Sequence, residues 1–206
     1  MNSAFFLLLL IFFVSNPQLS SAAKSPDPVR DTNGKKVGAV ARYYISPVYP
    51  ITGGIELENL DDKPCPLDVV LADQVPGLPV SFYSVKSKKG VIRVSTDLNV
   101  ELPTTIPSTI CPNSTMWSID ISPSTGNYFV STGGQRGSPG PNTIINWFKI
   151  EPFGSGSYKL VYCPTFCKTC KVICKDVGIV VQNGKRRLGL TDDPMKFVLK
   201  NALKGF

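Results

Sequence analysis

The sequence predicts an all-β protein built from many short strands. Eighteen prolines and seventeen glycines interrupt the chain of 206 residues at short intervals, and both residue types favour turns. The runs between them are short and either apolar or alternating, with little of the periodicity of an amphipathic helix. These three features are typical of a fold made of sheets.

Twelve runs are candidate strands, which fits a β-trefoil of three four-stranded units, although a β-sandwich could use the same number. In chain order the candidates are Ala41–Ile45, Leu67–Leu71, Val80–Phe82, Val91–Val94, Asn99–Leu102, Met116–Ile121, Tyr128–Ser131, Trp147–Glu151, Tyr158–Cys163, Val177–Val181, Arg187–Leu190 and Lys196–Leu199.

The C-terminal segment Met195–Phe206 allows two interpretations. Lys196, Lys200 and Lys204 recur at fourfold spacing, as they would on a cationic amphipathic helix. The apolar run from Phe197 follows a turn at residues 192–194 and can instead complete the last strand. We favour the strand.

The first 23 residues are typical of a signal peptide. They carry no charged side chain, hold the apolar run Phe5–Val14 and end in small residues up to Ala23. Ten apolar residues are too few for a membrane span, which needs about 20. We therefore expect a leader at residues 1–23 and one exported domain at 24–206, with no membrane span.

The formal charge of +7 belongs entirely to the exported part and indicates a soluble protein. A nucleic-acid-binding surface would interleave basic residues with exposed aromatic rings. Here the aromatic residues lie inside the strand-like runs, so we expect a core role for them and no nucleic-acid partner. They are Tyr43, Tyr44, Trp117, Tyr128, Phe129, Trp147 and Phe148.

Six cysteines in an exported chain indicate three disulfides, for which the sequence alone leaves fifteen pairings. The last four, Cys163, Cys167, Cys170 and Cys174, also resemble a tetrathiolate zinc cluster. An oxidising destination argues against four free thiolates. We expect no bound metal.

The chain contains no histidine, which removes the Ser-His and Cys-His nucleophile pairs and most catalytic zinc sites. Two carboxylates could still serve as a glycosidase pair, but the acidic doublets Asp61-Asp62 and Asp192-Asp193 lie in turn-like segments. No glycine-rich phosphate-binding loop joins a strand to a helix. We therefore predict that the protein is not an enzyme and needs no cofactor.

The pattern Val29–Val37, followed after five residues by Tyr43–Ile45, resembles the signature of the Kunitz-type soybean trypsin inhibitor family, nearest its miraculin-like branch. Further similar segments follow in order and extend the resemblance over the whole of residues 24–206. They are Cys65–Leu67, Gly90–Leu98, Asn146–Ile150, Tyr158–Pro164, Asp176–Ile179 and Arg186–Leu190. The resemblance implies a β-trefoil.

The resemblance also implies a disulfide pattern. In it Cys65 pairs with Cys111 and Cys163 pairs with Cys174. The remaining pair, Cys167 with Cys170, is an extra short bridge found in miraculin-like members.

Inhibitory members of the family present a convex loop that enters a protease as a substrate would. The matching segment here is the reactive loop, which we define as Lys86, Ser87, Lys88, Lys89 and Gly90. Lys88 lies near the specificity position, with Lys86 and Lys89 as alternative registers. A lysine there would pair with the aspartate in the pocket of a trypsin-like serine endopeptidase. A cysteine protease is a less favoured target, for which we assign no residue.

Two departures favour an alternative. The loop offers Ser87, Lys89 and the flexible Gly90 where many inhibitory relatives have proline, aromatic or branched apolar residues. Ala39 also replaces the family's loop-supporting asparagine and has no side-chain donor. The alternative is a non-inhibitory, miraculin-like binding, storage or defence protein on the same scaffold.

The segment Asn113-Ser114-Thr115 is an N-glycosylation sequon in a turn-rich part of the chain, so we expect a glycan on Asn113. Asn16-Pro17 in the leader resembles plant vacuolar-sorting peptides but precedes the expected cleavage point. We expect an extracellular monomer, with the vacuole as second choice.

Overall fold

The computed structural model describes residues 25–60, 65–73, 75–85, 90–103, 114–123 and 125–203. In these residues it contains one short 3-10 helix, η1 (Pro141–Asn146), and twelve strands. The strands are β1 (Arg42–Pro47), β2 (Gly54–Glu58), β3 (Asp68–Ala72), β4 (Val80–Ser84), β5 (Leu98–Glu101), β6 (Ser118–Ile121), β7 (Tyr128–Ser131), β8 (Lys149–Pro152), β9 (Tyr158–Tyr162), β10 (Lys175–Gln182), β11 (Lys185–Thr191) and β12 (Phe197–Asn201).

Six of these strands form a closed barrel. Antiparallel pairing runs from β5 to β4, β1, β12, β9 and β8. Leu98 and Phe148 close the ring between β5 and the residue before β8, because each backbone amide donates to the other's carbonyl at 2.9 Å. Closure pairs the two edges that an open sheet would leave exposed.

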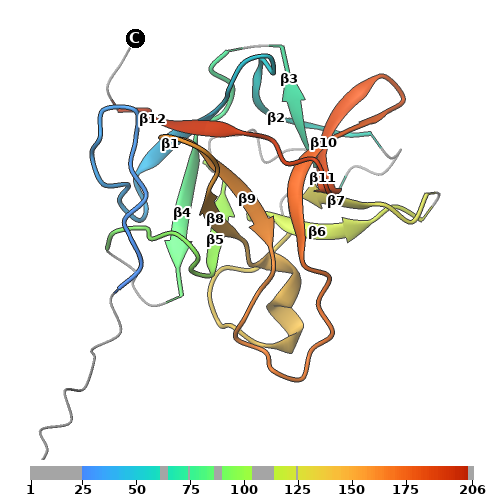
Figure 1. The fold of residues 1–206 in the computed structure, drawn as a ribbon. Helices are drawn as coiled ribbons and strands as arrows, with labels where there is room; N and C mark the ends of the chain where they lie inside the picture. The colour runs from blue at the N-terminus through green and yellow to red at the C-terminus, as the bar shows by residue number, and fades with distance from the viewer. Residues whose placement is uncertain are drawn as a thin grey trace, which may run out of the picture.

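The other six strands form three hairpins, β2–β3, β6–β7 and β10–β11, which lie together on one side of the barrel (Figure 1). Their inner strands β3, β7 and β11 also pair with one another, so the hairpins make a threefold cap. Each unit of four strands, β1–β4, β5–β8 and β9–β12, contributes two barrel strands and one hairpin. This arrangement is a β-trefoil, as the sequence predicted.

Most of the aromatic residues that the strand pattern assigned to the core are buried in the barrel or beneath the cap. Trp117 and Phe148 meet edge to face with ring centroids 6.2 Å apart, and Phe148 meets Tyr162 at 6.1 Å. Tyr43, Phe129 and Trp147 are also buried, whereas Tyr44 and Tyr128 are half-buried. Burial of these rings accounts for the strand-like spacing of aromatics in the sequence.

The cap contains a buried ion pair. Arg187 of β11 and Asp68 of β3 are 3% and 4% exposed, and their side chains are directly hydrogen-bonded. The Arg187 guanidinium lies 3.7 Å above the ring of Phe129 on β7. The contact therefore joins the inner strands of all three hairpins.

Two expectations about strands were wrong. Residues Val91–Val94 form only isolated bridges, Gly38 to Val91 and Pro28 to Arg93, because their neighbour is an irregular N-terminal segment. Strand β2 was not among the predicted strands; it begins at Gly54, and glycine is uncommon inside strands. A Cβ on Gly53 would lie 2.2 Å from the carbonyl oxygen of Ala72, so this glycine permits the close approach of β2 to β3.

The other predicted strands all overlap strands of the structure. The ambiguous C-terminal segment is a strand, because β12 pairs with β1 from Phe197 opposite Pro47 to Asn201 opposite Tyr43. The helical interpretation of that segment was wrong for the part that the structure describes.

Candidate functional site

The predicted reactive loop falls in the sequence between β4 and β5. The ends of β4 and β5 that flank it lie at the end of the barrel that also carries the β9–β10 connection (Figure 1). Lys86, Ser87, Lys88 and Lys89 lie outside the described residues, whereas Val85 and the exposed Gly90 lie inside them. The two stems begin as a regular ladder, with Ser84 opposite Leu98. The Val85 amide continues it with a 3.3 Å hydrogen bond to the Asp97 carbonyl.

An N-terminal segment, residues 28–40, runs along the C-terminal stem. Its amide at Ala39 donates to the carbonyl of Gly90 at 2.7 Å, and the amide of Ile92 donates back to Val37 at 2.9 Å. Ile92 and Val37 are fully buried. The residues that follow the reactive loop are therefore fixed to the core by backbone hydrogen bonds and apolar packing together.

The resemblance assigned the loop-supporting position to residue 39, and the structure places Ala39 directly beside the end of the loop. Ala39 contacts Gly90 through its backbone amide. Its methyl side chain packs against the core and has no polar atom to offer. The contact between residue 39 and the end of the loop is therefore made by the main chain alone, and we call it the brace.

Two residues at the base of the loop adopt left-handed backbone conformations that are uncommon for their types. Val40 has φ 71° and Ser95 has φ 56°. The Val40 amide donates to Phe82 at 3.0 Å, and the Ser95 amide donates to Ile150 at 3.0 Å. Such backbone conformations cost about 1–3 kcal/mol each. The hydrogen bonds around Val40 and Ser95 must therefore offset this cost and hold the two residues in place.

Two clefts flank the N-terminal stem, and both include Ser84 and Val85 in their walls. The larger, about 550 Å³, is also lined by Val40, Tyr83 and Trp147 among others. The smaller, about 260 Å³, lies toward the β9–β10 connection. The stem is consequently a ridge with a hollow on either side.

Tyr83 forms part of the larger cleft with a distinctive polar environment. Burial, followed by its hydrogen bond to Glu101, raises the pKa of Tyr83 to about 12. The Arg136 guanidinium lies 4.0 Å above its ring and is itself paired with Glu101. Tyr83 therefore stays protonated over the physiological range and acts as a fixed wall of the cleft.

The β9–β10 connection carries the disulfides that the resemblance implied. Cys163 is bonded to Cys174, and Cys167 to Cys170, so one bridge is nested inside the other. These four cysteines are therefore not available as a zinc site. Cys65 is also disulfide-bonded. Its expected partner, Cys111, lies outside the described residues.

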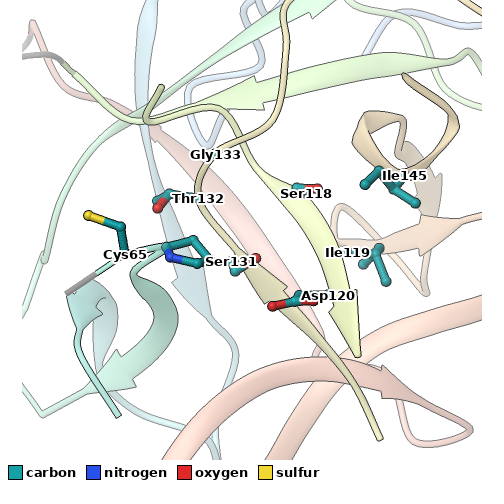
Figure 2. A pocket seen from close by; sticks show the side chains of 9 residues that line it. Cys65, Ser118, Ile119, Asp120, Ser131, Thr132, Gly133 and Ile145 are labelled. Atoms are coloured by element: carbon teal, nitrogen blue, oxygen red, sulfur yellow. The ribbon is translucent and has the colours of Figure 1, made fainter. Parts of the chain in front are cut away.

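A third hollow lies on the cap side and had no signal in the sequence. It encloses about 300 Å³ and draws on separate segments: Cys65 and Pro66, Ser118–Asp120 of β6, Ser131–Gly133 at the end of β7, and Ile145 of η1. Figure 2 shows the oxygens of Ser131, Thr132 and Asp120 along one side of it. Thr132 accepts a hydrogen bond from the Leu67 amide, so its hydroxyl has a structural use.

The glycosylation residue Asn113 lies outside the described residues, but the rest of its sequon does not. Ser114 is exposed, and its carbonyl accepts from the Gly133 amide at 2.8 Å. The Thr115 hydroxyl donates to the Leu102 carbonyl at 2.7 Å. The segment that follows Asn113 is therefore on the surface and tied to the barrel.

Neither a metal centre nor a membrane-spanning helix is found in the part of the chain that the structure describes. The His, Cys, Asp and Glu side chains there form no group of three or more that could hold a metal ion. The helical content there is the short η1, and no helix is long and apolar enough to cross a bilayer.

Comparison with known proteins gives a consistent result. Residues 29–201 match the family model described as "Trypsin and protease inhibitor". Miraculin from Synsepalum dulcificum is 45% identical, with 95% of this chain and 92% of that protein covered. Kunitz trypsin inhibitor 5 from Arabidopsis thaliana is 42% identical, with 96% and 97% covered.

A solved structure agrees with these matches. The Kunitz-type cysteine protease inhibitor PCPI-3 from potato superposes with a TM-score of 0.76 at 34% identity, covering 88% of this chain and 100% of that one.

Proposed function

The chain belongs to the Kunitz-type family of plant trypsin and protease inhibitors, and from this we propose that it inhibits a trypsin-like serine endopeptidase through the reactive loop Lys86–Gly90. Members of this family act as inhibitors rather than as enzymes. The observation that supports the proposal most strongly is the anchoring of both loop stems to the barrel.

Rigid stems matter because a substrate-like loop is also a potential substrate. Affinity in such complexes comes largely from order that exists before binding, since little conformational entropy is then lost. Here Gly90 is held by Ala39, Ile92 is fully buried, and Leu98 closes the barrel against Phe148. These contacts would hold the two ends of the loop in fixed positions for the protease.

The three lysines of the loop set the expected specificity. A trypsin-like pocket has an aspartate at its base and binds a lysine side chain. We propose Lys88 as the specificity residue, with Lys86 and Lys89 as alternative registers. A cysteine protease remains a secondary target, which the similarity to PCPI-3 from potato supports at the level of the scaffold.

A second candidate function is a non-inhibitory binding, storage or defence role on the same scaffold. The 45% identity to Miraculin favours it, as do the main-chain-only brace at Ala39 and the glycine at position 90, which has no side chain to restrict its backbone. A fold by itself does not fix a function, so the two candidates differ only in what the loop does.

We further propose that residues 1–23 are removed during export, that the protein is extracellular, with the vacuole as second choice, and that Asn113 carries a glycan. The paired cysteines support an oxidising compartment. The exposed position of Ser114 supports access of the glycosylation machinery to its neighbour.

The test is an active-site titration of the purified, oxidised protein from residue 24 onward against trypsin, chymotrypsin and papain. We expect stoichiometric inhibition of trypsin that the Lys88→Ala variant loses. Lys185→Ala on the distant cap should inhibit like the wild type. Inhibition that survives in Lys88→Ala shifts the register to Lys86 or Lys89, and no inhibition of any protease overturns the proposal in favour of the second candidate.

A further inference from the structure

Asp97 occupies a position where the C-terminal stem of the reactive loop enters the barrel. It immediately precedes β5, and its carbonyl accepts the hydrogen bond from the Val85 amide in the opposite stem. Its side chain is only 10% exposed. A buried carboxylate so close to a surface loop requires partners, since an isolated buried charge is costly.

Those partners come from outside the loop. One carboxylate oxygen, Oδ2, accepts both the Thr165 hydroxyl at 2.7 Å and the Thr165 amide at 3.2 Å. The other oxygen, Oδ1, is buried and accepts no hydrogen bond from the described residues, but it lies 3.9 Å from the Nζ of Lys149 on β8. Asp97 is thus bound on one side and electrostatically stabilised on the other.

Thr165 is itself held firmly. It lies in the disulfide loop, which we define as residues 163–174, just after Cys163 and its bond to Cys174. The next residue, Phe166, packs edge to face against Trp147, with ring centroids 5.4 Å apart. Trp147 is 1% exposed, so the disulfide loop is anchored to the core where Thr165 meets Asp97.

We propose that Asp97 is a positioning residue for inhibition, which clamps the C-terminal stem of the reactive loop to the disulfide loop through Thr165. This inference rests on the proposed inhibitory function. The clamp is distinct from the brace at Ala39, because it acts on the side chain of the stem residue and connects it to a different part of the fold.

The clamp has a defined chemical consequence. When a protease hydrolyses the loop, one water adds across the peptide bond and gives a new carboxylate and a new amine. Religation releases that water, and it is efficient only while the two ends stay close and oriented. The Asp97–Thr165 contact holds the C-terminal side of the cut, while the Val85–Asp97 hydrogen bond ties the N-terminal side to it.

The first test measures how fast trypsin permanently cleaves the protein during prolonged incubation. Thr165→Val removes the hydroxyl donor at nearly constant volume, and Asp97→Ala removes the carboxylate. Hydrogen bonds to a carboxylate are stronger than neutral ones, so each variant should be cleaved about tenfold faster or more. Thr165→Ser keeps the hydroxyl and should behave like the wild type.

A matched control separates the clamp from general loss of stability. Asp176 pairs with Lys159 at 2.8 Å in a partly buried contact between β10 and β9, with side chains 20% and 24% exposed. The Asp176→Asn variant should lower the unfolding temperature about as much as Thr165→Val and leave the cleavage rate unchanged. Equal cleavage rates in all variants, or equal acceleration by Asp176→Asn, would overturn the proposal.

A second measurement does not depend on inhibition. Amide hydrogen exchange in the free protein reports the Val85 amide directly, because that amide donates to the Asp97 carbonyl. Its exchange should be at least about tenfold faster in Thr165→Val and unchanged in Asp176→Asn. If the wild type inhibits no protease, the proposed function fails, and the exchange rate alone then tests whether the clamp exists. An unchanged exchange rate of the Val85 amide in Thr165→Val would contradict the clamp.

Discussion

The backbone amide of Ala39 donates a 2.7 Å hydrogen bond to the carbonyl oxygen of Gly90, the last residue of the predicted reactive loop. Two segments far apart in the sequence thus meet at the base of the loop. The contact puts residue 39 where a longer polar side chain could reach Gly90.

Replacing Ala39 with asparagine should strengthen inhibition. A side-chain amide adds two donors and one acceptor at this position, and each net hydrogen bond is worth about 1 kcal/mol, or roughly fivefold in affinity. The measurement is the inhibition constant for trypsin in Ala39→Asn against the wild type. Ala39→Leu, which adds volume without polar atoms, should not improve it, and equal constants for wild type and Ala39→Asn would contradict the assigned role.

The two nested disulfides should differ in their contribution to stability. Cys163–Cys174 spans a sequence separation of 11 and Cys167–Cys170 one of 3. In the loop-entropy model the wider bridge stabilises by about 3 kcal/mol and the narrow one by about 2 kcal/mol. In two variants, both cysteines of one bridge are replaced by serine, and urea unfolding measures the unfolding free energy that each variant loses. A larger loss for the Cys167–Cys170 variant would contradict this order.

The buried pair Asp68–Arg187 should be sensitive to loss of one partner. Asp68→Ala leaves the Arg187 charge buried at 3% exposure, which should cost about 3–5 kcal/mol of unfolding free energy. Replacing both residues, Asp68→Leu with Arg187→Met, should recover most of that loss. Asp192→Ala, which breaks an exposed pair with Lys175, is the control and should cost about 1 kcal/mol or less.

Recovery of stability in the double variant would show that the loss in Asp68→Ala comes from the buried charge of Arg187. A single variant at Asp68 that is no less stable than Asp192→Ala would mean that the cap does not depend on this pair.

Tyr83 should make stability depend on alkaline pH. Burial raises its folded-state pKa from its usual value near 10 to about 12, so the unfolded chain releases the proton first as the pH rises. The stabilising contribution is complete below pH 10 and is lost between pH 10 and about 12. Tyr83→Phe has no hydroxyl to titrate. As the pH rises through this range, the unfolding free energy of the wild type should therefore fall steadily relative to that of the variant. A difference in unfolding free energy that stays constant would contradict this prediction.

The architecture was largely predictable because its determinants are local. Turn residues and short apolar runs placed all the strands but one, and the aromatic runs marked the core. Strand β2 was missed because it begins at a glycine pair, and only the structure shows that Gly53 lies against the backbone of Ala72. Segment Val91–Val94 has a strand-like sequence, but its neighbour is the irregular N-terminal segment, and no local pattern indicates that.

The site was less predictable because its contacts join distant residues. The sequence, by resemblance, assigned the reactive loop to Lys86–Gly90, which stays a prediction, and the loop-supporting position to residue 39, whose backbone amide contacts Gly90. It could not indicate that Asp97 meets Thr165, since a carboxylate before a strand and a threonine after a cysteine carry no mutual signal. The left-handed conformations of Val40 and Ser95 were equally hidden, because neither residue type favours them.

The most direct test of substrate-like inhibition is to locate the bond that trypsin cleaves. The oxidised protein is incubated with a trace of trypsin, then reduced, and the fragments are identified by mass spectrometry. We predict a single early cut after one of the loop lysines, Lys86, Lys88 or Lys89, with the cut protein still inhibitory. An early cut elsewhere in the chain, or inhibition that is complete while the loop is never cut, would contradict it.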